Sequence, residues 1–318
     1  MQPLSQTSQR HARVAVCIAT FKRPELLKYL LAGISKLAFE KMPSPEISVV
    51  VVDNDAGGSA EGTCRATQLP WPIKYIVEPH RGIAQARNRA IKEAGRVDFI
   101  SFLDDDEIPT PAWLDELLWA QACFGADVVC GSVLPRFANG VPDWVRTGGF
   151  FDRTYDSGCS LDTCGAGNVL ITSRVFTTVT NFDERFALTG AEDWHFFLRV
   201  RRAGYAIVSS SGAVVHESVS ASRASLTGVL RRAYYSGNSW VLCESYLDGS
   251  VSTRILRMTK ACGRILQGMA STCLSPFLGR VALAKGLRGL CLGAGMLTAL
   301  AGRSYNAYEA PDTNAAEG

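Results

Sequence analysis

Apolar runs alternate with amphipathic stretches through the first half of the chain. Short runs rich in β-branched residues predict strands, and stretches with apolar residues every three or four positions predict helices. The predicted strands cover 14–19, 47–52, 73–77, 99–103 and 127–134, and the predicted helices cover 24–37, 82–94 and 111–123, the last capped by Thr110. The run 47–52 is apolar almost throughout, as in strands buried on both faces. This alternation predicts an α/β fold, in which helices cover both faces of a Rossmann-like, mostly parallel central sheet.

The regular alternation ends at about residue 135. Residues 135–164 are polar and aromatic, rich in Gly and Asp, and show no period, which is typical of a functional or mobile loop. The elements predicted after this loop are strands at 168–171, 205–208 and 213–215, and helices at 192–203 and 224–244. We expect one domain over 14–250, a disordered segment over 1–13 and a flexible tail over 304–318.

The segment 251–303 has a charge pattern of its own. From 254 to 303 it carries eight Lys or Arg residues and no acidic residue, whereas the last fifteen residues carry three acids and no base. At helical spacing an apolar face opposes a cationic one, with Ile255, Met258, Cys262, Ile265, Met269 and Cys273 on the first and Arg257, Lys260 and Arg264 on the second. This pattern is typical of basic amphipathic helices that lie on an anionic membrane surface. A helical pair packed on the domain and a membrane-spanning segment are the alternatives.

Composition narrows the class of protein. Apolar residues make up 47% and charged residues 20% of the chain, which excludes wholesale disorder. A net charge of +3 is too small to indicate nucleic-acid binding. Residues 1–13 lack the apolar core of a secretion signal, and the ten cysteines show no metal-ligand spacing. We therefore expect a cytoplasmic protein with reduced cysteines.

Polar residues follow three of the predicted strands, at the edge where open α/β sheets bind ligands. They are Thr20, Phe21 and Arg23 after the first strand, Asp53 after the second, and the carboxylates 104–107 after the fourth. In extended backbone Asp104 and Asp106 point the same way, and their oxygen ligands suit Mg²⁺ or Mn²⁺. A solvated acidic turn is the alternative. The stretch 19–24 has no glycine, which argues against a dinucleotide-binding turn.

Four further side chains carry candidate chemistry. Arg87 lies within the apolar stripe of its predicted helix and needs an anionic partner, either a protein carboxylate or a ligand phosphate. Glu192 fits a capping box that starts at Thr189, whereas Asp193 has no capping duty and can face a cleft. His216 follows a short strand, where it can be a structural histidine or a third metal ligand.

Six segments in one order resemble the family-two glycosyltransferases of bacterial exopolysaccharide and cell-surface glycan synthesis. They are 16–24, 50–54, 82–88, 102–107 with 111–114, 165–168 and 190–193. The resemblance spans about residues 14 to 240. It implies the GT-A fold and an inverting enzyme that transfers a hexose from a nucleotide-diphosphate sugar, with a UDP-sugar favoured.

The resemblance also implies roles for individual residues. Those implied to bind the nucleotide are Thr20, Phe21, Arg23, Asp53, Arg87, Asp104 and Asp105. Those implied to hold the metal are Asp104, Asp106 and His216, and those assigned to the donor and acceptor loop are Gly167, Asn168 and Trp113. Asp193, supported by Glu192, is implied to take the proton from the acceptor hydroxyl in a single displacement that inverts the anomeric carbon.

The implied cofactor is Mn²⁺ or Mg²⁺, and the implied acceptor is a glycan or a polyprenyl-linked saccharide at the inner face of the cytoplasmic membrane. The Q-x-x-R-W element of processive synthases is absent from the sequence, which predicts that one sugar is added per encounter. Two alternatives remain. One is a sugar-nucleotide pyrophosphorylase-type nucleotidyltransferase, although its Gly-rich basic N-terminal signature is missing. The other is a non-catalytic carbohydrate-binding relative.

Overall fold

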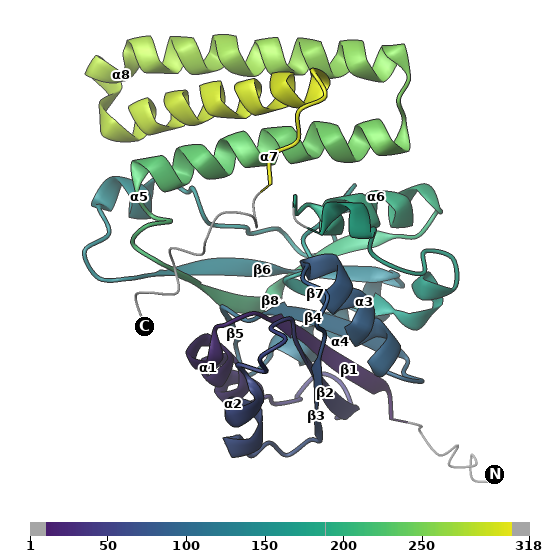
Figure 1. The fold of residues 1–318 in the computed structure, drawn as a ribbon. Helices are drawn as coiled ribbons and strands as arrows, with labels where there is room; N and C mark the ends of the chain where they lie inside the picture. Colours follow the sequence, from purple (N-terminus) through teal and green to yellow (C-terminus); the bar gives the residue numbers. More distant parts are fainter. Residues whose placement is uncertain (1–10, 188, 307–318) are drawn as a thin grey trace, which may run out of the picture.

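The protein is built around one β-sheet with helices on both of its faces (Figure 1). The computed structural model describes residues 11–187 and 189–306, and within them the sheet has eight strands in the order β3-β2-β1-β4-β7-β6-β8-β5. The strands are β1 (Arg13–Thr20), β2 (Glu46–Asp53), β3 (Ile73–Val77), β4 (Phe99–Asp104), β5 (Glu107–Pro109), β6 (Val128–Phe137), β7 (Asn168–Thr172) and β8 (Ile207–Val219). The helices are α1 (Pro24–Ile34), α2 (Glu61–Ala66), α3 (Ile83–Glu93), α4 (Trp113–Phe124), α5 (Asp143–Thr147), α6 (Glu192–Arg202), α7 (Leu226–Leu247) and α8 (Val251–Leu300).

The first four strands pair in parallel, and β7 is antiparallel to both of its neighbours. This arrangement confirms the predicted α/β fold with a mostly parallel sheet. Thr20 is paired with Asp53, and Ala19 with Asp104. Because parallel strands end at the same edge of a sheet, the polar residues after three strands meet there.

Each face of the sheet has its own apolar core. Residues of α1 and α4 pack on one face, with Trp113 and Leu30 fully buried. Residues of α3 and α6 pack on the other face, where Phe196 stacks on Phe182 with 4.4 Å between ring centroids. A helix on each side of a parallel sheet removes both faces from water, which explains the nearly continuous apolar runs of the strands.

The strands near the far edge differ from the prediction. β8 is one continuous strand over the two predicted segments, because it pairs with β6 along its length across a register shift beside Gly131. The polar residues 209–212 interrupt the apolar run and conceal this continuity in the sequence. The short strand β5 was not predicted, and it pairs with the end of β8. The predicted cap of α4 is also wrong, since the Thr110 hydroxyl donates to the Val214 carbonyl at 3.1 Å and α4 begins at Trp113.

Helices α7 and α8 form a separate layer beyond α6 (Figure 1). Gly279 has a non-helical backbone with φ 83°, and it divides α8 into two arms that run back along each other. Small residues allow the close packing, since a Cβ on Gly295 would lie 2.0 Å from the Tyr234 carbonyl oxygen. A Cβ on Gly268 would lie 2.8 Å from the Gly286 carbonyl oxygen in the same way. The layer is therefore held by backbone-to-backbone contact between glycine-bearing faces.

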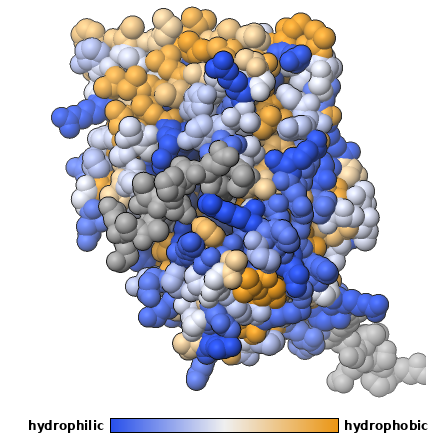
Figure 2. Space-filling model, in the orientation of Figure 1, coloured by the Kyte–Doolittle hydropathy of each residue, from blue (hydrophilic) through white to orange (hydrophobic). Residues whose placement is uncertain are grey.

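The predicted apolar face of α8 is not the face that packs on the domain. Ile255 is 62% exposed, Met269 52% and Phe277 at the turn between the arms 87%. Figure 2 shows this apolar surface as a band over the two arms, at the top of the view. By length and composition alone α8 could cross a membrane, which is weak evidence, and the chain reverses direction at Gly279. The boundaries at 14–250 and 251–303 stay predictions, and residues 1–10 and 307–318 of the predicted flexible ends lie outside the described residues.

Candidate active site

A run of four carboxylates, residues 104–107, lies where β4 ends and β5 begins. The Asp104 side chain is 42% exposed, whereas the Glu107 side chain is 1% exposed. Each carboxylate has a different arginine partner, and the N–O distances are 2.8 Å for Arg87–Asp104, 3.2 Å for Arg23–Asp105, 3.1 Å for Arg223–Asp106 and 3.6 Å for Arg153–Glu107. The run is therefore part of an ion-pair network and not a solvated acidic turn.

Burial disfavours the ionised form of several carboxylates in this network. Desolvation raises the pKa of Asp106 to about 7, although the Arg223 guanidinium counteracts the rise. Desolvation also raises the pKa of Asp105 and of Glu107. One Glu107 carboxylate oxygen is buried without a hydrogen bond from the described residues. An additional cation would favour the ionised form of each of these groups, so the acidic run is suited to a positively charged ligand.

Arg87 joins the acidic run to helix α6. Its side chain is 6% exposed, and it donates to Asp104 at 2.8 Å and to Glu192. Desolvation raises the pKa of Glu192 to about 8, and Arg87 opposes that shift. The anionic partner that we expected for Arg87 is thus a pair of protein carboxylates, Asp104 and Glu192. One guanidinium holds the end of β4 against the first residue of α6.

The backbone before α6 has an uncommon conformation. Gly190 and Ala191 both have positive φ, 67° and 65°, and a non-glycine residue in this region is strained. The predicted capping box does not form, because the Glu192 side chain is bound to Arg87, and the Thr189 hydroxyl instead donates to the Gly190 carbonyl at 3.3 Å. The tight turn presents Glu192 and Asp193 side by side at the start of α6.

Asp193 is half-buried beside the segment that leads into β7. One carboxylate oxygen accepts a hydrogen bond from the Trp194 amide at 2.7 Å, and the other accepts from the Ala166 amide at 3.4 Å. Desolvation raises the pKa of Asp193, with Arg87 acting against it. The carboxylate is therefore fixed in orientation while its affinity for a proton is increased, which suits a general base.

The residues after β1 contact the acidic run. The Thr20 hydroxyl donates to Asp105 at 2.9 Å, and Arg23 pairs with the other oxygen of the same carboxylate. The half-buried ring of Phe21 lies 5.0 Å from the Arg81 guanidinium. The structure thus brings together the predicted nucleotide residues Thr20, Phe21, Arg23 and Asp105.

Asp53 has a full set of protein partners. Its carboxylate accepts hydrogen bonds from the Ala60 amide at 2.7 Å, the Tyr75 hydroxyl at 2.9 Å and the Asp55 amide at 3.0 Å. The residue is completely buried. It organises the loop after β2, and its direct contact with a nucleotide base stays a prediction.

Trp113 and Asn168 lie in α4 and β7 and are buried, not in a loop, and their contact with donor or acceptor stays a prediction. The Trp113 indole is fully buried and donates to the Asn168 side-chain oxygen at 2.7 Å. The Asn168 amide group donates to the Ser132 and Ala213 carbonyls. Both side chains serve the core because they satisfy each other's polar groups behind the site. Gly167 does reach the site, since a Cβ there would lie 2.7 Å from a Glu107 oxygen.

His216 lies on a different face of β8 from Glu217. On the β5–β8 pair, Glu107 faces Glu217 and Ile108 faces His216. Because neighbouring side chains of a strand point to opposite faces, Glu217 shares a face with Glu107 and His216 does not. The role of His216 as a metal ligand stays a prediction.

Three site residues were missed at the level of sequence. Arg153 and Arg223 both contact Glu217, with N–O distances of 3.5 Å and 2.5 Å. The sequence did contain a signal for Glu217, because this charged residue takes the place of an apolar one in the alternating pattern that includes Val215 and Val219. No comparable signal exists for the two arginines, since both lie outside regular elements.

The carboxylates suit a divalent cation by the chemistry of their donor atoms. Within the described residues, no group of three or more His, Cys, Asp or Glu side chains is already arranged as a metal site. Asp104 and Asp106 nevertheless provide the oxygen ligands that Mg²⁺ and Mn²⁺ prefer, in a pocket short of positive charge. Two protein carboxylates with phosphate oxygens are a usual ligand set for such ions.

Comparison with known proteins places the chain in a family. Residues 15–179 match the model of glycosyl transferase family 2. The chain belongs to this family. The family-2 chain is also 33% identical over 235 residues to the succinoglycan biosynthesis protein ExoM of Rhizobium meliloti, an alignment that covers 72% of this chain and 74% of ExoM. The predicted family is therefore confirmed.

Two solved structures are similar in fold to this family-2 enzyme. The mannosyltransferase PcManGT of Pyrobaculum calidifontis, in complex with GDP-Man and Mn²⁺, has a TM-score of 0.64 at 16% identity and covers 93% of this chain and 89% of its own. S. aureus TarS 1-349 has a TM-score of 0.50 at 16% identity and covers 92% of this chain and 93% of its own. These similarities confirm the predicted GT-A fold.

Replacing Arg87 by Met tests the bridge between β4 and α6. The substitution leaves the buried Glu192 without its cation, and we expect a loss of about 3–5 kcal/mol in the free energy of unfolding. The neighbouring Arg89, which pairs with Glu93 on the same helix, is the matched control, and Arg89→Met should cost less than about 1 kcal/mol. Urea denaturation measures both. Equal losses in the free energy of unfolding for the two substitutions would contradict a stabilising role of the Arg87 ion pairs.

Proposed function

We propose that this family-2 glycosyltransferase moves a hexose from a nucleotide-diphosphate sugar to a hydroxyl of a growing exopolysaccharide, with inversion at the anomeric carbon. The observation that carries the proposal is the contact of Arg87 with both Asp104 and Glu192. It brings the acidic run, where a donor's phosphates would lie, next to helix α6, which begins with Glu192 and has Asp193 as its second residue. The likeness to ExoM supports a place in exopolysaccharide synthesis.

The proposed donor pocket lies at the carboxyl ends of β1, β2 and β4. Thr20, Phe21 and Arg23 would contact the nucleotide, with Asp53 beneath them, and Asp105 is held in place by Thr20 and Arg23. Arg87 and Arg23 supply positive charge near the diphosphate. A UDP-sugar is the favoured donor.

The proposed reaction is one displacement. Asp193 accepts the proton of the acceptor hydroxyl, and that oxygen attacks the anomeric carbon as the bond to the diphosphate oxygen breaks. The released diphosphate carries the negative charge that develops, and Arg87 lies where it can stabilise that charge. A divalent cation held by Asp104 and Asp106 would offset the same charge when bound. Attack opposite the leaving group inverts the configuration.

We also propose that the apolar surface of α8 attaches the enzyme to the inner face of the cytoplasmic membrane. Leu274, Phe277 and Leu278 are all more than half exposed at the turn between the arms. The arms carry only cationic charge, which complements anionic lipids. Such attachment would place the site beside a lipid-linked saccharide acceptor.

Replacing Asp193 by Asn tests the base. The amide cannot take a proton, so we expect nucleoside diphosphate release with donor and membrane lipid extract to fall about 10²–10⁴-fold, while donor binding by calorimetry is unchanged. Asp162→Asn is the matched control, because Asp162 is 92% exposed and its ion-pair partner is Arg201, near the opposite end of α6 from Asp193. Turnover of the Asp193 variant at the wild-type rate would refute the assignment.

Removing divalent cations tests the proposed metal. Treatment with a chelator should abolish sugar transfer, and Mn²⁺ or Mg²⁺ should restore it. Asp106→Asn should raise the cation concentration that gives half-maximal activity, because the site loses one oxygen ligand. Full activity in the chelator, with the Asp106 variant unchanged, would exclude a metal-dependent enzyme.

Replacing Phe277 and Leu278 by Ser tests membrane attachment. Both side chains are exposed, so the fold should persist, while co-flotation with vesicles of phosphatidylcholine and phosphatidylglycerol should fall about tenfold or more. Tyr29→Ser is the control, since Tyr29 is 57% exposed on α1, outside the C-terminal layer. Undiminished flotation of the double variant would argue against this surface.

A further inference from the structure

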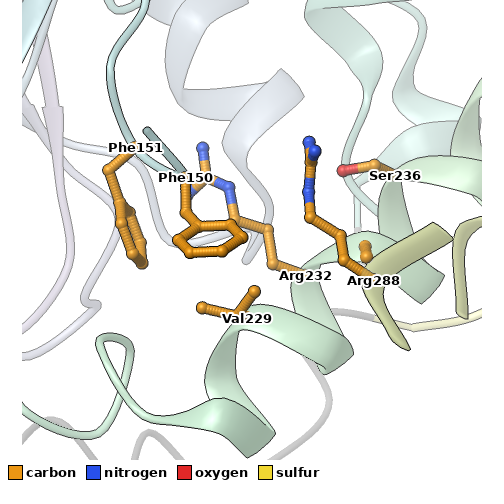
Figure 3. A pocket seen from close by; sticks show the side chains of 7 residues that line it. Phe150, Phe151, Val229, Arg232, Ser236 and Arg288 are labelled. Atoms are coloured by element: carbon orange, nitrogen blue, oxygen red, sulfur yellow. The ribbon is translucent and has the colours of Figure 1, made fainter. Parts of the chain in front are cut away.

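A cavity of about 510 Å³ lies between the two arms of α8 and the loop after α5. Its lining includes Phe150 from the loop, Arg264 from the first arm, and Lys285 and Arg288 from the second. A second, smaller cavity shares Phe150 and Arg288 and adds Arg232 from α7. We call the two together the basic groove. Figure 3 shows Phe150 beside Arg232, with the Arg288 side chain next to them.

The basic groove carries positive charge without matching negative charge. Among the residues that the structure describes, neither cavity is lined by Asp or Glu, and Lys285 and Arg288 form no hydrogen bond or ion pair. Desolvation lowers the pKa of Arg288, and Arg264 lowers it further. Desolvation also lowers the pKa of Arg232, although Glu217 acts in the opposite direction. A polyanion in the groove would relieve this repulsion.

The elements that line the groove also contribute residues to the apolar surface of α8 and to the candidate active site. The first arm of α8, which contributes Arg264 to the groove, also exposes Met269 and Leu274. On its other side, the loop runs from Phe150 through Phe151, whose ring lies 5.9 Å from the Arg232 guanidinium, to Arg153. Arg153 already pairs with Glu107 of the acidic run. One short segment therefore has its aromatic end in the groove and its charged end in the site.

We propose that the basic groove binds the phosphate or diphosphate of an amphiphilic acceptor, whose lipid tail lies along the apolar surface of α8 while its sugar reaches Asp193. The inference rests on the proposed function for the identity of the acceptor. Arg264 and Arg288 provide the hydrogen-bond donors, which suit phosphate oxygens better than any neutral headgroup. The aromatic residue Phe150 closes the groove on the side of the loop.

Farnesyl diphosphate is a suitable probe, with inorganic diphosphate and farnesol as its two halves. By calorimetry on the full chain, farnesyl diphosphate should bind more tightly than either half. Arg264→Gln and Arg288→Gln should each weaken its binding about tenfold through the loss of charge-assisted hydrogen bonds. Arg254→Gln is the matched control, because Arg254 is an exposed arginine of α8 outside the groove.

Competition separates the groove from the donor pocket. Saturating UDP or GDP should not displace farnesyl diphosphate, and the groove variants should bind either nucleotide as the wild type does. If Asp106→Asn weakens donor binding at limiting Mn²⁺ but keeps farnesyl diphosphate binding, both sites stand as proposed. Three results would each overturn the proposed lipid-phosphate site: displacement of farnesyl diphosphate by the nucleotide, unchanged farnesyl diphosphate binding in the two groove variants, or an equal affinity of the wild type for inorganic diphosphate. Failure of the Asp193 substitution to slow transfer would instead overturn the proposed function and leave the binding result intact.

Discussion

The buried ion pairs of Arg87 hold the site together. A guanidinium inside a protein is stable only when carboxylates surround it, and here one carboxylate comes from β4 and the other from α6. Helix α3 therefore sets the separation between the acidic run and Asp193. The positive φ of Ala191, which is strained for a non-glycine residue, accompanies this constraint, because the chain turns sharply just before Glu192.

The same principle extends to the rest of the acidic run. Each of its carboxylates meets an arginine from a different part of the chain, and two of these arginines also share Glu217 on β8. Burial still raises the pKa of Asp106 to about 7, so the network is incomplete without further positive charge. A cationic or cation-bound ligand would favour the ionised form of these carboxylates.

In the C-terminal layer, the surfaces that pack together differ from the surface that is exposed. Glycine-bearing faces pack α8 against α7 and against itself, so that the larger apolar side chains are left on the outer surface. If those side chains packed between the helices, the layer would have an ordinary apolar core. Here the loop that lines the basic groove with Phe150 continues to Arg153, which pairs with Glu107 of the acidic run.

The sequence by itself determined the α/β fold, the family and the placement of Thr20, Asp104 and Asp193 near one edge of the sheet, because periodicity and strand ends are local properties. Only the tertiary structure decided which charges pair, since Arg153 and Arg223 come from irregular segments that carry no periodic signal. It also placed Trp113 and Asn168 in the core and put His216 on another face of β8 from Glu217, because burial and strand register depend on which elements become neighbours. The sequence also did not predict which face of α8 packs on α7, because close backbone approach depends on glycines, whereas the hydrophobic pattern identifies only the larger apolar side chains.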